Sequence, residues 1–147
     1  MTLLDDKSIS REVSIPESRK RSIKMFLQGA VYSWCKNRKG EWFSLQDLMG
    51  GDNFYWEGTP LEYLYQRHEK LGKTPPSALK DAGIDAGWLL KGVLKQDLRK
   101  FRTHAGYRKK YKWDTEQSQC IWRDSLKKDI FQRSFPHLSK RCLLPAM

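Results

Sequence analysis

Residues 77–101 read SALKDAGIDAGWLLKGVLKQDLRKF, and their pattern decides the expected fold. Apolar residues recur at helical spacing on both sides of Gly83, which predicts a short helix at about 76–82 and a longer helix at 85–99. Gly83 suits a sharp reversal of the chain because glycine accepts a positive φ. Asp85 can cap the second helix. The stretch therefore predicts two helices joined by a tight turn.

The longer helix has an outer side that is polar and cationic. Measured from its apolar stripe, Lys95 and Arg99 fall on the side opposite the core, with Lys91 and Gln96 beside them. These side chains are able to contact phosphates or base edges. Asp97 falls on the inward arc, so it needs a buried partner or the helix must end there.

A basic and aromatic stretch follows, reading RKFRTHAGYRKKYKW over residues 99–113. It holds seven Lys/Arg and four aromatic residues, and it contains no Asp or Glu. The pattern predicts a β-hairpin with strands at 101–103 and 107–113 and a turn at 104–106. Such a cationic hairpin is suited to contact with a polyanion.

Cationic and aromatic residues alternate along the return strand of this hairpin. The period of two places the aromatic residues on one face and cations on the other. The aromatic face holds Tyr107, Tyr111 and Trp113, and the cationic face holds Arg108, Lys110 and Lys112. We expect the rings to anchor the strand to the core while the cations stay in solvent.

Helices account for most of the remaining chain. The expected elements are helices at 14–35, 45–49, 60–71 and 115–133 and a very short strand at 41–43. Trp34, Trp42, Phe43 and Trp122 are expected in the core. The sequence thus predicts a mainly α fold with a small β-hairpin, arranged as one domain over 14–135. Residues 1–13 and 136–147 are expected to be tails, the first of them flexible, and helix 115–133 is a C-terminal extension of the domain.

The order of short helix, glycine turn, longer helix and basic hairpin resembles the winged helix-turn-helix superfamily of DNA-binding proteins. Leu79 and Ala82 match the buried positions of the first helix, and Gly83 matches the turn glycine. The resemblance covers roughly residues 20–113 and points to no specific family. The helix at 60–71 is an addition to the minimal winged pattern, which leaves open which helix pair forms the motif.

The resemblance implies a non-enzymatic protein that binds duplex DNA. Helix 85–99 would enter the major groove as a recognition helix, and the basic wing at 100–113 would contact flanking phosphates. The candidate nucleic-acid-binding residues are Lys91, Lys95, Gln96, Arg99, Arg102, His104, Arg108, Lys110 and Lys112.

The overall charge favours the same class of partner. The 147 residues include 28 Lys+Arg against 17 Asp+Glu, for a net charge of +11. Two alternatives stay open. Tyr107 and Tyr111 could stack unpaired bases of RNA or a single strand. The winged fold could instead bind an acidic protein, and helix 115–133 could then form a homodimer.

Other functional classes find little support in the sequence. No phosphate-binding glycine motif or zinc-ligand spacing occurs, so no cofactor and no metal site are expected. The acidic residues do not suggest a converged nuclease site. Three cysteines without paired spacing favour a reducing, cytoplasmic location. Since no apolar run is long enough to span a bilayer, no membrane partner is expected.

Overall fold

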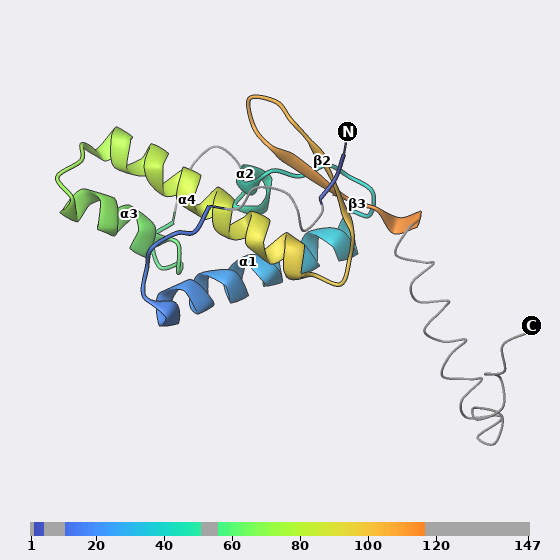
Figure 1. Cartoon of the computed structure of the whole chain (residues 1–147), viewed down its shortest axis with the longest axis horizontal. Coiled ribbons are helices and arrows are strands. Elements are labelled where there is room, and N and C mark those ends of the chain that lie inside the picture. The colour runs from blue at the N-terminus through green and yellow to red at the C-terminus, as the bar shows by residue number, and fades with distance from the viewer. Residues whose placement is uncertain (1, 5–10, 51–55, 117–147) are drawn as a thin grey trace, which may run out of the picture. The chain divides into compact units, whose positions relative to one another are not determined.

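The computed structural model describes residues 2–4, 11–50 and 56–116 (Figure 1). These residues form a mainly helical fold with a small antiparallel sheet, as the sequence predicts. The helices are α1 (Glu17–Asn37), α2 (Leu45–Leu48), α3 (Glu62–Lys70) and α4 (Pro75–Gln96). The strands are β1 (Thr2–Leu3), β2 (Phe101–His104) and β3 (Lys110–Trp113). All seven elements belong to the compact unit Met1–Asp114.

The predicted break at Gly83 is wrong, because α4 continues through it as one helix of 22 residues. A buried stripe passes both sides of Gly83 at helical spacing, through Ala78, Ala82, Ala86 and Leu90. Glycine within a helix costs only about 1 kcal/mol relative to alanine. Packing of the continuous stripe against the core outweighs that cost.

The chain reverses instead at Gly72, between α3 and α4. Gly72 has a φ of +80°, a left-handed conformation that favours glycine. Pro75 occupies the first turn of α4, where its missing N–H costs no hydrogen bond. The structure therefore contains a helical hairpin, but it consists of α3 and α4.

The three strands form an antiparallel sheet in the order β1-β2-β3. The hairpin β2–β3 confirms the predicted one, although its connection is longer and includes Tyr107. Tyr107 is fully exposed there, so its predicted place on the core face is wrong. An isolated bridge joins Phe43 to Tyr111, at the end of the predicted strand 41–43.

The N-terminal residues contribute more to the fold than the expected tail. Thr2 and Leu3 pair with β2, and Val13 is buried in the core. The prediction of a flexible tail is therefore wrong for the described part of residues 1–13. Helix 115–133 and the tail at 136–147 lie outside the described residues, apart from the first two positions of that helix.

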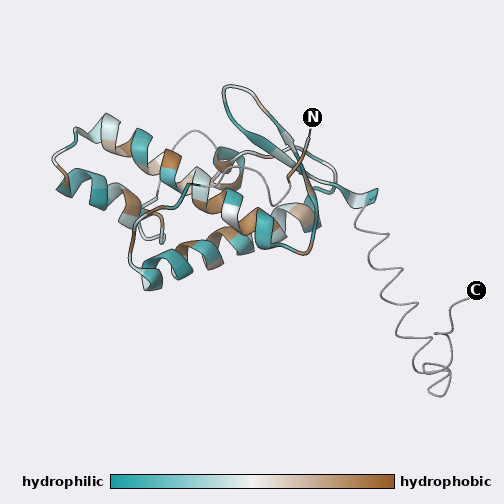
Figure 2. Cartoon of the chain, viewed as in Figure 1, coloured by the Kyte–Doolittle hydropathy of each residue, from teal (hydrophilic) through white to brown (hydrophobic). Residues whose placement is uncertain are grey.

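The core lies between α1, α4 and the inner face of the sheet (Figures 1 and 2). α1 buries Ile23, Leu27 and Val31, the stripe that the sequence predicts. Phe43 and Phe101 meet edge to face, with ring centroids 6.1 Å apart. Figure 2 shows apolar segments of α1 and α4 alternating with hydrophilic ones. Among helices in the described ranges, none has the length and apolarity needed to cross a bilayer.

Candidate nucleic-acid interface

The sheet turns a row of cations away from the core. β2 and β3 pair in register so that Arg102 lies opposite Lys112 and His104 opposite Lys110. Their neighbours Phe101, Thr103 and Tyr111 are buried on the inner face. Because successive residues of a strand point to opposite faces, all four basic side chains share the outer face. This confirms the alternation predicted for residues 110–113.

Trp42 joins these cations on the outer face. Its ring centroid lies 6.0 Å from that of His104, in an edge-on arrangement, and 6.0 Å from Nζ of Lys112. The expectation that Trp42 lies in the core is therefore wrong. Phe43 takes the core position by pairing with Tyr111, and the alternation along the strand turns the preceding residue outward. We call Trp42, Arg102, His104, Lys110 and Lys112 the outer sheet face.

The carboxylate of Asp114 offsets part of the positive charge on this face. Nε of Arg102 donates a hydrogen bond to Oδ2 of Asp114 at 2.8 Å, and Asp114 is buried. This contact fixes the Arg102 guanidinium on the outer sheet face. Like charges placed opposite each other across strands destabilise a sheet by a few tenths of a kcal/mol to about 1 kcal/mol. Arg102 and Lys112 lie opposite each other in this way, and Asp114 offsets part of their repulsion.

The hairpin connection carries further cations. Arg108 and Lys109 are exposed in this connection, next to Lys110 at the start of β3. Burial lowers the pKa of Lys91 in α4, and the like charges of Lys109 and Lys95 lower it further. Lys109 at the hairpin tip and Lys95 of α4 therefore both act on Lys91, in a region that holds several positive charges.

Lys91 itself does not lie on an exposed surface of α4. It is only 5% exposed, and its Nζ lies 5.1 Å from the ring centroid of Trp88. Its predicted position on the outer side of the helix is wrong, because it lies next to the buried Leu90 within α4's packed face. Lys91 can contribute charge to the region but is not placed for direct contact.

Arg99 also differs from its predicted position. α4 ends at Gln96, so Arg99 follows the helix instead of lying on its outer side. Its Nη2 and Nε donate to the two carboxylate oxygens of Asp97 at 2.5 and 2.8 Å. The side chain of Arg99 is 16% exposed. Arg99 is therefore a structural partner of Asp97.

The environment of Asp97 confirms that this residue needs a partner. Besides Arg99, Nε2 of Gln28 in α1 donates to its Oδ2 at 2.7 Å. Burial acts to raise the pKa of Asp97, but the hydrogen bonds from Arg99 and Gln28 outweigh it and hold the pKa below its ordinary value. The carboxylate consequently stays charged and ties the end of α4 to α1.

Lys95 and Gln96 line a groove beside the start of α1. The groove has a volume of about 540 Å³, and Trp88 forms part of its wall. Its polar lining is Arg11, Glu12, Lys20, Lys24, Lys95 and Gln96. We call this the α1–α4 groove. No sequence signal placed Lys20 and Lys24 of α1 next to Lys95 of α4.

The structure thus brings the nine predicted residues into three groups. Arg102, His104, Lys110 and Lys112 lie together on the outer sheet face, and Arg108 lies in the adjoining turn. Lys95 and Gln96 line the groove. The last group, Lys91 and Arg99, is turned inward. Within the described ranges, no cluster of His, Cys, Asp and Glu is suited to hold a metal ion.

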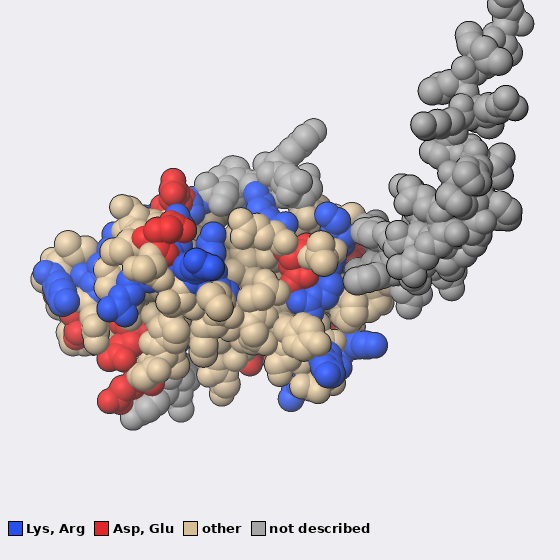
Figure 3. All heavy atoms as spheres, turned by 90° about the horizontal axis from the view of Figure 1, so that it is seen from below, with Lys and Arg blue, Asp and Glu red and all other residues tan. Residues whose placement is uncertain are grey.

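Charge is not spread as a uniform cationic layer. Figure 3 shows basic and acidic side chains interspersed on one face of the molecule, with a broad uncharged area between them. A scan against protein-family models and searches of curated proteins and solved structures find no match for this chain.

Proposed function

We propose that this chain is a non-enzymatic nucleic-acid-binding protein and that its main ligand is duplex DNA. The observation that carries the proposal is the outer sheet face, where four basic side chains occupy two directly opposed cross-strand pairs. Arg102 is held by Asp114, and Lys110 and Lys112 place further positive charge on the neighbouring strand. A phosphate backbone along the sheet would be attracted to these side chains on both strands.

Part of α4 extends this surface. Lys95 lies in the last turn of the helix and Gln96 at its end, and both are accessible to a ligand. The charge of Lys109 at the hairpin tip acts on the same stretch of α4 through Lys91. We propose that the hairpin contacts phosphates while Lys95 and Gln96 contact the adjacent groove of the duplex.

The order of elements supports a winged arrangement. α1 is followed by the Phe43 bridge, and that bridge pairs with β3 of the hairpin. α4 leads directly into β2, so a helix and a cationic hairpin are consecutive in the chain. In the proposed arrangement the C-terminal part of α4 takes the role of the recognition helix, and α3 takes the place of its partner.

The test is a salt series of duplex binding. If six to eight phosphates are neutralised, log K should fall against log salt with a slope of roughly −5 to −7. The triple variant Arg108→Gln, Lys110→Gln and Lys112→Gln should weaken binding to all duplexes and flatten this slope by about 3. A matched control replaces the three exposed residues Lys36, Lys70 and Lys80 by Gln. Equal losses in the two triple variants would show that only net charge matters and would refute the proposed surface.

A second candidate ligand is a single strand or RNA, and Trp42 favours it. An aromatic ring beside basic side chains on a sheet is typical of surfaces on which unpaired bases stack. The outer sheet face offers such a ring next to His104 and Lys112. Competition between duplex and single-stranded oligonucleotides at equal salt distinguishes the two candidates.

A further inference from the structure

The α1–α4 groove has the features of a separate ligand site. Its volume of about 540 Å³ falls within the range of pockets that hold small organic ligands. It is lined by residues 11–13, the first two turns of α1 and the C-terminal half of α4. Residues 11–13 adjoin α1 in the sequence, whereas α4 is distant from both, so the fold is what assembles the groove.

The charge of the lining favours the binding of an anion. Arg11, Lys20, Lys24 and Lys95 contribute four cations, and Glu12 is the single acidic residue among the lining side chains. Nζ of Lys20 lies 3.2 Å from Oε1 of Glu12, and it also lies 3.9 Å from a carboxylate oxygen of Glu17. The Glu12 side chain is 85% exposed, so this ion pair is weak and readily exchanged. A phosphate group could replace Glu12 on Lys20.

An aromatic side chain accompanies this charge. The indole of Trp88 lines the groove, and Nζ of Lys91 lies 5.1 Å from its centroid. Leu89 and Gly92 complete the wall of α4 around it. An indole beside several ammonium groups matches a ligand that has both a flat ring and phosphates. Gln96 adds an amide that can donate and accept hydrogen bonds with a base edge.

We propose that the α1–α4 groove binds a nucleotide, with its base against Trp88 and its phosphates on Lys20 and Lys24. The ligand could be a free nucleotide or an unpaired nucleotide at the end of a nucleic-acid strand. The groove shares Lys95 and Gln96 with the surface proposed for duplex DNA, but none of its lining residues belongs to the outer sheet face, so its binding of a nucleotide is tested separately. In the absence of ligand, the carboxylate of Glu12 occupies the position of a phosphate by pairing with Lys20.

Calorimetric titration of the full chain at low ionic strength tests the proposal, with ATP, inorganic triphosphate and adenosine as probes. ATP should bind at least about fivefold more tightly than triphosphate because only ATP gains the contact with Trp88. Trp88→Leu should remove this difference, whereas Trp88→Phe should retain most of it. Equal binding of ATP and triphosphate by the native chain would overturn the assignment of a nucleotide.

Charge variants of opposite sign test the phosphate side. Lys20→Gln should weaken the binding of both ATP and triphosphate by about fivefold, and Lys36→Gln is the matched control outside the groove. Glu12→Gln should strengthen both by about threefold because it frees Lys20. Glu41→Gln makes the same change in net charge away from the groove. If Glu12→Gln and Glu41→Gln have equal effects, the groove is not the site.

Two further arms identify the source of the nucleotide and separate this proposal from the first. A single-stranded trinucleotide with a 5′-phosphate that binds more tightly than ATP, and depends on Trp88, would indicate a strand end. Tighter binding of ATP would indicate a free nucleotide. The variant Lys110→Gln and Lys112→Gln should bind ATP normally even where duplex binding is lost. Loss of ATP binding in that variant would refute a separate site.

Discussion

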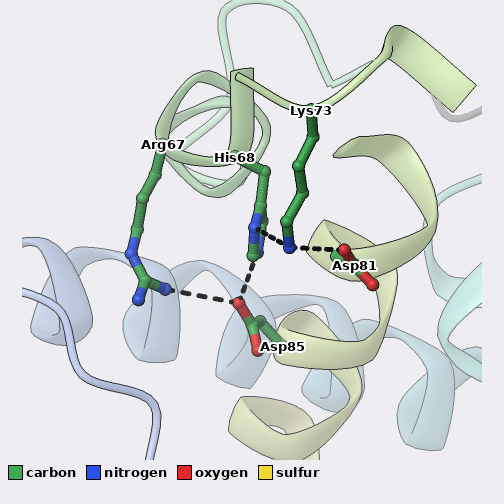
Figure 4. Close-up of polar contacts among 5 residues, drawn as sticks. All are labelled: Arg67, His68, Lys73, Asp81 and Asp85. Carbon is green, nitrogen blue, oxygen red and sulfur yellow. Dashed lines mark hydrogen bonds and ion pairs between the residues drawn. The ribbon is translucent and has the colours of Figure 1, made fainter. Parts of the chain in front are cut away.

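His68 of α3 donates a hydrogen bond to Asp85 of α4, with 2.8 Å between Nε2 and Oδ2, and both residues are buried (Figure 4). Nζ of Lys73 lies 3.1 Å from the other ring nitrogen, Nδ1. An ammonium group can only donate, so Nδ1 accepts and the ring proton resides on Nε2. Arg67 adds a longer contact to Asp85 at 3.4 Å. The α3–α4 hairpin is therefore joined by a polar network as well as by apolar packing.

Asp85→Ala should destabilise the fold by about 3 kcal/mol. The change leaves the buried N–H of His68 without an acceptor and leaves Arg67 without its partner. Asp81, one turn away on α4, is the matched control because its contact with Lys73 is more exposed. Urea unfolding should show a clearly smaller loss for Asp81→Ala. Similar losses of stability in the two variants would show that the buried hydrogen bond between His68 and Asp85 contributes no more than the exposed contact of Asp81.

Substitutions at two glycines test where the chain reverses. Gly83→Ala should stabilise the protein by about 0.5–1 kcal/mol, because Gly83 lies within α4 and nothing lies within 4 Å of an added Cβ. Gly72→Ala should destabilise it by about 1 kcal/mol, because its φ is +80°. Thermal unfolding of both variants measures the difference. A destabilised Gly83→Ala would instead support the turn that the sequence pattern suggested.

The sequence predicts much of the fold where periodicity and burial agree. α1 follows from its stripe of Ile23, Leu27 and Val31, and the hairpin follows from the alternation that buries Tyr111. The break at Gly83 could not be excluded, because a mid-helix glycine and a turn glycine look alike in one sequence. Only the packing of α4 against its neighbours decides between them.

Prediction of the site was limited by small errors in the bounds of α4. The helix ends at Gln96, so Arg99 leaves the expected helical face and binds Asp97. Lys91 and Lys95 are only four residues apart, yet Lys91 is buried in the packed face of α4 and Lys95 is partly exposed. The groove residue Lys20 was not predictable, because its contact with the region depends on how α1 packs against α4.

Asp97 should make stability depend on acid pH. Its pKa is lower in the folded chain than its ordinary value, so the charged form contributes stability above the unfolded pKa. That contribution is lost as the pH falls from about 4 towards the lower folded pKa. Asp97→Asn should therefore cost about 2 kcal/mol at neutral pH, and the difference should shrink below about pH 4. A difference that is constant between pH 7 and pH 3 would contradict this role.

Cys35 should be nearly inert in the folded protein. It is 2% exposed, and burial raises the pKa of its thiol to about 11. The reactive thiolate is therefore about a hundredfold scarcer than for a thiol with the ordinary value of 9.0. A pulse of iodoacetamide at neutral pH should leave the Cys35 peptide unmodified by mass spectrometry. The same peptide should react fully in urea, and rapid labelling without urea would show that this part of α1 opens readily.

Trp42 provides the sharpest distinction between a duplex and a single-stranded ligand. If duplex DNA is bound through phosphates, Trp42→Ala should weaken duplex binding by less than about threefold, and Lys112→Gln should weaken it more and reduce the salt slope by about 1. If unpaired bases stack on the outer sheet face, Trp42→Ala should reduce single-strand affinity by about 1–3 kcal/mol. Trp42→Phe is the control, since it keeps a ring beside Lys112 and His104. In the duplex proposal most of the binding free energy comes from ionic contacts with phosphates, whereas in the alternative it comes from stacking of bases on Trp42. Equilibrium titrations of these three variants at two salt concentrations therefore decide between them.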